Sequence, residues 1–171
     1  MLLWIIVIVA SVLLDQITKM IVVNSMELYQ SISVIDKVFS FTYIHNYGAA
    51  WGMLSDHRWV FILVTAIAIV ILPIFLYRYR KLHFMFGFSL SLIIGGAIGN
   101  MIDRVFLGYV VDFLEATFID FPVFNVADIC VCVGAVILFI YLSFFDKIIF
   151  PPDDKKKKEQ AAVNGEEEKN D

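Results

Sequence analysis

The chain has 171 residues, of which 60% are hydrophobic and 18% are charged, and its mean hydropathy is +0.82. A soluble domain of this length cannot bury so much apolar side chain, so the composition excludes an ordinary soluble globular protein and indicates a bilayer protein. The net charge of −4 identifies no partner, because the charges are segregated along the chain rather than spread over it.

Four stretches are long and apolar enough to cross a bilayer, which requires about 20 mostly apolar residues. They are residues 2–23, 59–77, 84–102 and 126–145. The first stretch lacks a basic leader, is too long for the core of a secretory signal, and precedes no small-residue cleavage site. We therefore predict an all-α membrane protein with four transmembrane helices, the first of them uncleaved.

The first predicted helix carries Asp15, Gln16, Thr18 and Lys19 in its outer half. Ionisable residues are costly in a span, which makes them candidates for a functional site. Asp15 and Lys19 are four residues apart and share a helix face. Two structural readings stay open beside a functional one: a self-neutralising pair, and a Lys19 that extends to the outer interface.

Two segments between the predicted spans are typical of strands. Residues 38–45 alternate and are rich in β-branched and aromatic side chains, and Gly48 follows them in a stretch that favours a close-packed turn. Residues 109–114 are short, apolar and extended in character. We expect a small sheet on the outer membrane surface, over about residues 34–56.

The third predicted helix is rich in glycine over residues 95–99, which favours close helix packing. It ends with Asn100, Asp103 and Arg104, of which the first two share a face and the third could grip a carboxylate with two hydrogen bonds. Such a cluster is more often scaffolding than chemistry.

The fourth predicted helix begins with Asn125, a good N-cap residue, and Asp128 three positions later suits the positive helix end. Asp112 is placed on the same outer side, in the preceding apolar loop. Two carboxylates in a partly dry site share one proton. Such a pair supplies a base that activates water and an acid that polarises a peptide carbonyl.

Competing chemistries have little support in the sequence. His45, His57 and His83 are scattered without metalloprotease spacing, and no serine-hydrolase or phosphate-binding motif is present. Cys130 and Cys132 are two positions apart on a helix, which disfavours a disulfide or a metal site. We therefore expect neither a metal nor another cofactor.

Basic residues near helix ends predict the orientation. Arg78, Arg80 and Lys81 connect the second and third spans, and Lys147 follows the fourth. Both places are expected to be cytoplasmic, so both termini should be inside and the two longer connections outside. Residues 1–150 would form the membrane domain and residues 151–171 a disordered, charged cytoplasmic tail.

Four blocks occur in order across most of residues 1–145. They are Asp15-Gln16-Ile17-Thr18-Lys19; Asn46-Tyr47-Gly48-Ala49-Ala50-Trp51; residues 95–104 continuing to Val110-Val111-Asp112-Phe113; and Phe124-Asn125-Val126-Ala127-Asp128. Together they resemble the lipoprotein signal peptidases, the signal peptidase II family. The resemblance implies four spanning helices with an outer β-cradle and a short outer helix.

The resemblance also implies an aspartic endopeptidase of the bacterial cytoplasmic membrane, with its site near the outer face. It would cleave prolipoproteins before the diacylglyceryl-modified cysteine, in contact with membrane lipids and without nucleic acid, and globomycin-type compounds would inhibit it. Asp112 and Asp128 would be catalytic. The supporting or substrate-contacting positions would be Asp15, Lys19, Asn46, Gly48, Asn100, Asp103, Arg104 and Asn125.

Two alternatives come from other classes of protein. A small proton-coupled transporter or channel component could use intramembrane polar residues as a relay, but the acids here gather near one face rather than along a path across the membrane. A non-catalytic scaffold would explain the glycine-rich third helix but not the two outer acids.

Overall fold

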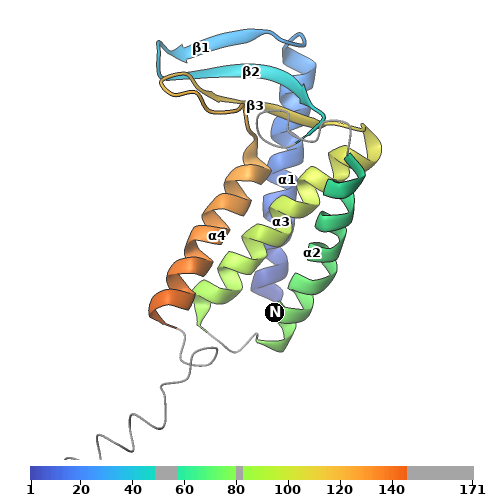
Figure 1. Cartoon of the computed structure of the whole chain (residues 1–171), viewed down its shortest axis with the longest axis vertical. Helices are drawn as coiled ribbons and strands as arrows, with labels where there is room; N and C mark the ends of the chain where they lie inside the picture. Colours follow the sequence, from blue (N-terminus) through green and yellow to red (C-terminus); the bar gives the residue numbers. More distant parts are fainter. Residues whose placement is uncertain (49–57, 80–82, 146–171) are drawn as a thin grey trace, which may run out of the picture. The chain divides into compact units, whose positions relative to one another are not determined.

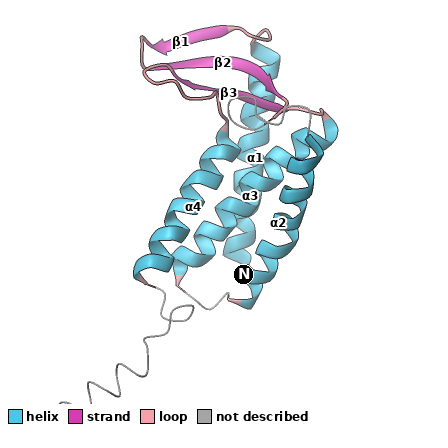
Figure 2. Ribbon diagram, viewed as in Figure 1, coloured by secondary structure: helices cyan, strands magenta, loops and turns pink. Residues whose placement is uncertain are grey.

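The structure is a computed structural model that describes residues 1–48, 58–79 and 83–145. Within these residues the chain forms four long helices and a three-stranded sheet (Figure 2). The elements are α1 (Leu2–Ser25), β1 (Ser31–Ile35), β2 (Phe39–Asn46), α2 (Arg58–Arg78), α3 (Phe84–Phe106), β3 (Val110–Ala116) and α4 (Val126–Phe144). All four helices are long and apolar enough to cross a membrane, so the expected fold class is confirmed.

The chain forms two compact units, Met1–Leu138 and Phe139–Asp171. The first contains the sheet, the first three helices and most of α4, and it holds every contact discussed below. Residues 49–57, which include the end of the expected 34–56 sheet region, lie outside the described residues, and so does the expected tail at 151–171. The described helices are the four long ones, so a short outer helix would also lie outside the described residues.

Helices α1 and α3 run parallel and in close contact, because α3 has a glycine at three of the places where α1 approaches it. A Cβ atom on Gly99 would lie 2.6 Å from the Asp15 carboxylate, and one on Gly95 would lie 2.6 Å from Ser11 Cβ. The pairs in order along both helices are Trp4 with Gly87, Ser11 with Gly95, and Asp15 with Gly99. This packing brings the polar residues of α1 directly against those of α3.

The antiparallel sheet, in the order β1-β2-β3, lies at one end of the helices, and the N-terminus lies at the other end (Figure 1). Val22 of α1 packs in a buried cluster with Tyr43, Val111 and Phe113 of the sheet. The sheet is therefore built from the segment after α1 and the segment after α3. The sequence reasoning identified both segments as extended without pairing them.

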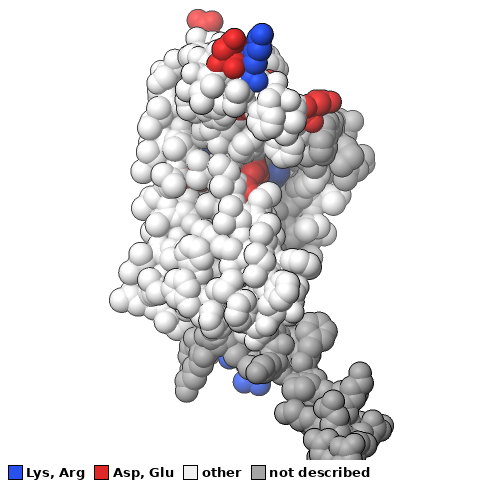
Figure 3. All heavy atoms as spheres, turned by 90° about the vertical axis from the view of Figure 1, so that its left-hand side faces the viewer, with Lys and Arg blue, Asp and Glu red and all other residues white. Residues whose placement is uncertain are grey.

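The helix faces that point away from the bundle are apolar and exposed. Trp59, Leu63 and Val70 of α2 are examples, each more than half exposed. One side of the molecule shows a broad uncharged band, with charges at the sheet end and an acidic group in a recess below the sheet (Figure 3). Exposed apolar surface on this scale suits lipid rather than water as the surrounding solvent.

Candidate active site

Asp112 is held inside the sheet by β3. It is 1% exposed and lies opposite Ile44 of β2, next to an irregularity in the pairing between Phe41 and Ile44. Such bulges re-aim side chains and are common beside active sites. Both carboxylate oxygens accept hydrogen bonds: Asn46 donates to one at 2.8 Å and Asn125 to the other at 2.6 Å.

Asp128 lies in the first turn of α4, where it forms a reciprocal cap with Asn125. The backbone N–H of Asp128 donates to the Asn125 side-chain oxygen at 3.0 Å, and the Asn125 N–H donates to the Asp128 carboxylate at 3.1 Å. The predicted N-cap is confirmed. This cap leaves the second carboxylate oxygen free for Asn100, whose amide donates to it at 2.8 Å.

A short piece of sheet pairing brings the two aspartates together. Phe124 exchanges backbone hydrogen bonds with Leu114 of β3, at 2.8 and 2.9 Å. The next residue, Asn125, therefore lies beside Asp112 while it also caps α4. One asparagine thus contacts both carboxylates, Asp112 through its side chain and Asp128 through its backbone N–H.

A buried ion network lies next to the two aspartates. The Lys19 ammonium lies 2.9 Å from Asp15 and 2.9 Å from Asp103, and it donates to the Asn100 oxygen at 3.0 Å. Lys19 is only 3% exposed, so the hypothesis that it extends to the interface is wrong. Asn100 therefore connects the lysine directly to Asp128.

The two acids of this network also fix backbone beside the aspartates. Asp15 accepts the Ala127 N–H of α4 at 2.9 Å, and Asp103 accepts the Val111 N–H of β3 at 3.0 Å. Each anchor lies one residue before a candidate catalytic aspartate. These hydrogen bonds fit the scaffolding role considered for Asp103, and they extend such a role to Asp15.

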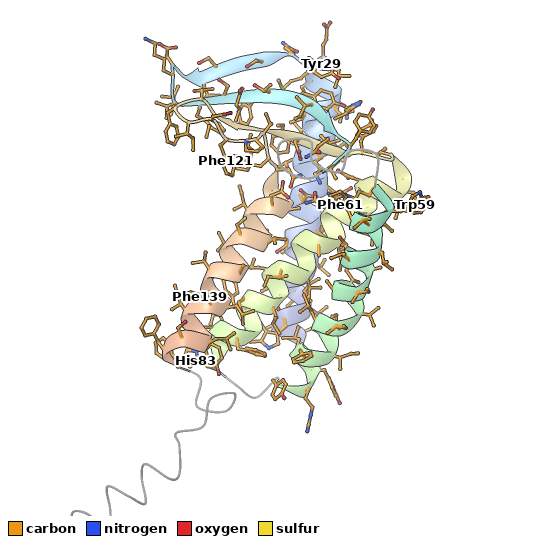
Figure 4. All side chains as sticks on the ribbon, in the orientation of Figure 1. Tyr29, Trp59, Phe61, His83, Phe121 and Phe139 are labelled. Atoms are coloured by element: carbon orange, nitrogen blue, oxygen red, sulfur yellow. The ribbon has the colours of Figure 1, made fainter. Side chains whose placement is uncertain are left out.

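Arg104 does not form the expected two-bond grip on a carboxylate. Its guanidinium donates to the Asn100 carbonyl at 3.4 Å and lies 5.4 Å from the centre of the Phe61 ring. Figure 4 shows Phe61 near the sheet end of α2. Among the described residues, the ion pair of Asp103 is with Lys19 of α1 rather than with Arg104, the next residue along the chain.

Asn46 is positioned by a turn and by an aromatic cluster. Its side-chain oxygen accepts the backbone N–H of buried Gly48 at 2.9 Å. The preceding residue, His45, stacks on Tyr109 with ring centres 3.7 Å apart, and its Nε2 is 2.8 Å from the Tyr43 hydroxyl. Partial burial lowers the pKa of His45. These contacts fix the strand end that aims Asn46 at Asp112.

Asp128 also faces open space. With Asn100 and Arg104 it lines a cavity of about 300 Å³ whose other walls are side chains of α2, α3 and α4. A cavity of this size lies at the lower end of the range for ligand sites. A reactant in it would meet Asp128 directly.

Burial raises the pKa of the Asp112 carboxyl to about 7, and the charge of Asp128 acts in the same direction. The hydrogen bonds from Asn46 and Asn125 oppose this rise, because donors favour the ionised form. The desolvation cost is larger, so Asp112 holds a proton more readily than an ordinary carboxyl. The arrangement is suited to proton transfer near neutral pH.

Gln16, which the sequence did not mark as a site residue, also belongs to the buried ion network. The Gln16 amide donates to Asp15 at 3.1 Å, to the Gly99 carbonyl at 3.2 Å and to Asp103 at 3.1 Å. The sequence signal for Gln16 is its place in the Asp15–Lys19 block. No group of three His, Cys, Asp or Glu side chains suited to a metal occurs in the described part of the chain.

The comparisons with known proteins agree with one another. The family model described as "Signal peptidase (SPase) II" matches residues 7–145. A lipoprotein signal peptidase from Geobacillus kaustophilus is 46% identical over 138 residues, which is 80% of this chain and 90% of that protein. One from Symbiobacterium thermophilum is 43% identical over 141 residues, 81% of this chain and 93% of that protein.

Two solved structures share the fold. Both are bacterial membrane enzymes crystallised by the in meso method. One has a TM-score of 0.78 and 33% identity, and covers 88% of this chain and 92% of the other. The second has a TM-score of 0.76 and 35% identity, with 84% and 94% covered.

Proposed function

This chain belongs to the signal peptidase II family, and from that premise we propose that it is an aspartic endopeptidase with Asp112 and Asp128 as its catalytic pair. Its reaction is the removal of signal peptides from bacterial prolipoproteins, by cleavage before the diacylglyceryl-modified cysteine. The observation that carries the proposal is the single asparagine, Asn125, that hydrogen-bonds to both carboxylates.

The two aspartates have different surroundings, which assigns them different roles. Asp128 lies at the N-terminus of α4, where the helix dipole favours negative charge, and it lines the open cavity. Asp112 lies in the sheet, and burial raises its pKa to about 7. We therefore assign the base to Asp128, which lines the cavity where the attacking water would lie, and the acid to Asp112.

In this mechanism Asp128 takes a proton from a water molecule as its oxygen attacks the scissile carbonyl. Asp112 donates a hydrogen bond to the carbonyl oxygen as negative charge develops there. Asp128 then passes the proton it took from water to the leaving amine as the C–N bond breaks. Lys19 contributes through Asn100, which holds the Asp128 carboxylate in place. General acid and base groups of this kind contribute about 10²–10⁴-fold to a rate.

A membrane setting suits such a substrate. A signal peptide is a hydrophobic helix, and the lipidated cysteine adds two acyl chains, so both approach laterally through the bilayer. We place the enzyme in the bacterial cytoplasmic membrane with the sheet and the site at the outer face, where membrane lipids surround it and globomycin-type inhibitors compete for the site. No contact of the described residues favours the transporter alternative.

The test is cleavage of a diacylglyceryl-modified prolipoprotein by the purified protein in lipid. Asp112→Asn and Asp128→Asn should each lower kcat by about 10²-fold or more while the protein remains folded. Asp120→Asn, on the exposed loop between β3 and α4, is the matched control and should cleave normally. Near-normal cleavage by either active-site variant would refute the residue assignment.

A further inference from the structure

A second cavity of about 300 Å³ lies between the outer end of α1 and the sheet. Residues of α1 and of the three strands β1, β2 and β3 form its walls. The apolar lining residues are Ile21, Val22, Met26, Ile32, Phe41 and Phe113. Two hydroxyl residues, Thr18 and Ser25, complete the lining. The Thr18 hydroxyl donates to helix carbonyls at 2.8 Å, so its hydrogen is not available to a ligand.

This cavity is separate from the candidate active site. It shares no lining residue with the cavity beside Asp128, which is lined by α2, α3 and α4. It nevertheless adjoins the catalytic strand, because Phe113 on its wall follows Asp112 in β3. Whatever fills the cavity packs against the strand that carries Asp112.

The mouth of the cavity opens onto the lipid-facing surface. Ile21 on α1 and Ile32 on β1 line it and are 57% and 45% exposed. The same helix also exposes Ile17 and Leu14, one and two turns deeper. The apolar outer face of α1 is thus continuous with the interior of the cavity.

The depth of the cavity matches the boundary between hydrocarbon and headgroups. Helix α1 has 24 residues, a length of about 36 Å at 1.5 Å per residue, which exceeds the hydrocarbon thickness of about 30 Å. Its last turns, where Val22 and Ser25 lie, therefore reach the level at which acyl chains join the glycerol of a lipid.

The size and chemistry of the cavity select its occupant. A helix is about 10–12 Å across with its side chains, too wide for this space, and a strand would leave backbone groups without partners on an apolar wall. A single hydrocarbon chain has neither problem. We propose that the cavity between α1 and the sheet binds one acyl chain of a bilayer phospholipid, independently of the peptidase reaction.

The test uses a phosphatidylethanolamine with a diazirine in one acyl chain, incorporated with the full-length protein into nanodiscs and activated by light. An ordinary surrounding lipid reaches exposed residues such as Leu14, but it cannot reach Phe113, which is 3% exposed. Adducts on the peptide that contains Phe113 are the expected result. Labelling requires no catalysis, so the outcome is independent of the proposed activity.

Two variants of β1 make the test specific. Ile32→Trp places a larger side chain in the cavity and should abolish labelling of Phe113. Val34→Trp is on the same strand and is slightly more exposed, at 53% against 45%, but lies outside the lining, so it should leave the labelling unchanged. Adducts confined to exposed α1 residues would overturn the proposal.

Discussion

The Lys19 ammonium is shared by two carboxylates and one amide oxygen, at 2.9, 2.9 and 3.0 Å. A single buried cation beside two acids is stable only because each acid has a further donor, the Ala127 N–H for Asp15 and the Val111 N–H for Asp103. The charges around Lys19 are therefore stabilised by groups from four elements, α1, α3, β3 and α4.

Replacing Lys19 by methionine should destabilise the protein strongly. The change leaves two buried carboxylates without their cation, a loss that typically costs about 3–5 kcal/mol. Thermal unfolding in detergent should show a clear fall in Tm. Lys37→Met, which removes the same charge from the exposed β1–β2 turn, should leave Tm almost unchanged. Equal Tm values for the two variants would contradict the network.

The pH dependence of cleavage should report the acid of the pair. The pKa of Asp112 is raised to about 7, so the protonated form is lost as pH rises through about 7, and kcat/KM should fall above that pH. The Asn46 hydrogen bond favours the ionised form and lowers this pKa. Asn46→Leu should therefore move the alkaline limb of the kcat/KM profile to higher pH.

A matched control for this shift is Asn24→Leu, at the exposed outer end of α1, where the amide donates to the Met20 carbonyl. Its alkaline limb should coincide with that of the wild type. An unmoved or lowered limb in Asn46→Leu would show that Asp112 is not the group that titrates.

At the level of whole elements, the contact between α3 and α4 depends on a glycine. A Cβ atom on Gly96 would lie 2.3 Å from the Ala127 carbonyl oxygen and 2.8 Å from a Val131 methyl. The first of these is backbone, so it cannot rotate away. The helices must separate to admit even one methyl group, and Ala127 precedes Asp128.

Gly96→Ala should therefore cost about 1–3 kcal/mol of stability, the usual penalty for overpacking, and should reduce kcat by moving Asp128 away from Asn100. Unfolding and cleavage measured on the same preparation would check both effects. Ala10→Val, on the exposed face of α1, adds volume where nothing opposes it and should change neither quantity. Wild-type behaviour of Gly96→Ala would mean that the packing is looser than described.

The elements themselves could be predicted because their signals are local. A run of apolar residues as long as a bilayer is thick specifies a spanning helix, and the four predicted stretches agree with the observed helices to within a few residues. The cap of Asn125 and Asp128 was predictable for the same reason, since its partners are three residues apart.

The contacts between elements could not be predicted in this way. The pairing of Phe124 with Leu114, which brings Asn125 to Asp112, depends on how a loop folds back onto β3, and no periodic pattern encodes it. Arg104 is a second example. Its charge suggested a carboxylate partner, but the Asp103 carboxylate pairs with Lys19 from another helix.

For the whole molecule, the orientation in the membrane follows from where its basic residues lie. Arg78 ends α2, Arg80 and Lys81 follow it, and the four-lysine run lies beyond α4. Cytoplasmic loops retain such residues, so the sheet should face outward. This orientation also presents the site to substrates whose signal peptides have already crossed the membrane.

Cysteine labelling of intact bacteria can test this orientation. In a background with Cys130 and Cys132 replaced by serine, Asp36→Cys in the exposed β1–β2 turn should react with a membrane-impermeant maleimide. Lys169→Cys in the tail should react only after the cells are permeabilised, because the inner membrane shields it. The reverse pattern would place the aspartate pair on the cytoplasmic side, where a translocated prolipoprotein could not present its cleavage site, and would exclude the proposed reaction along with the orientation.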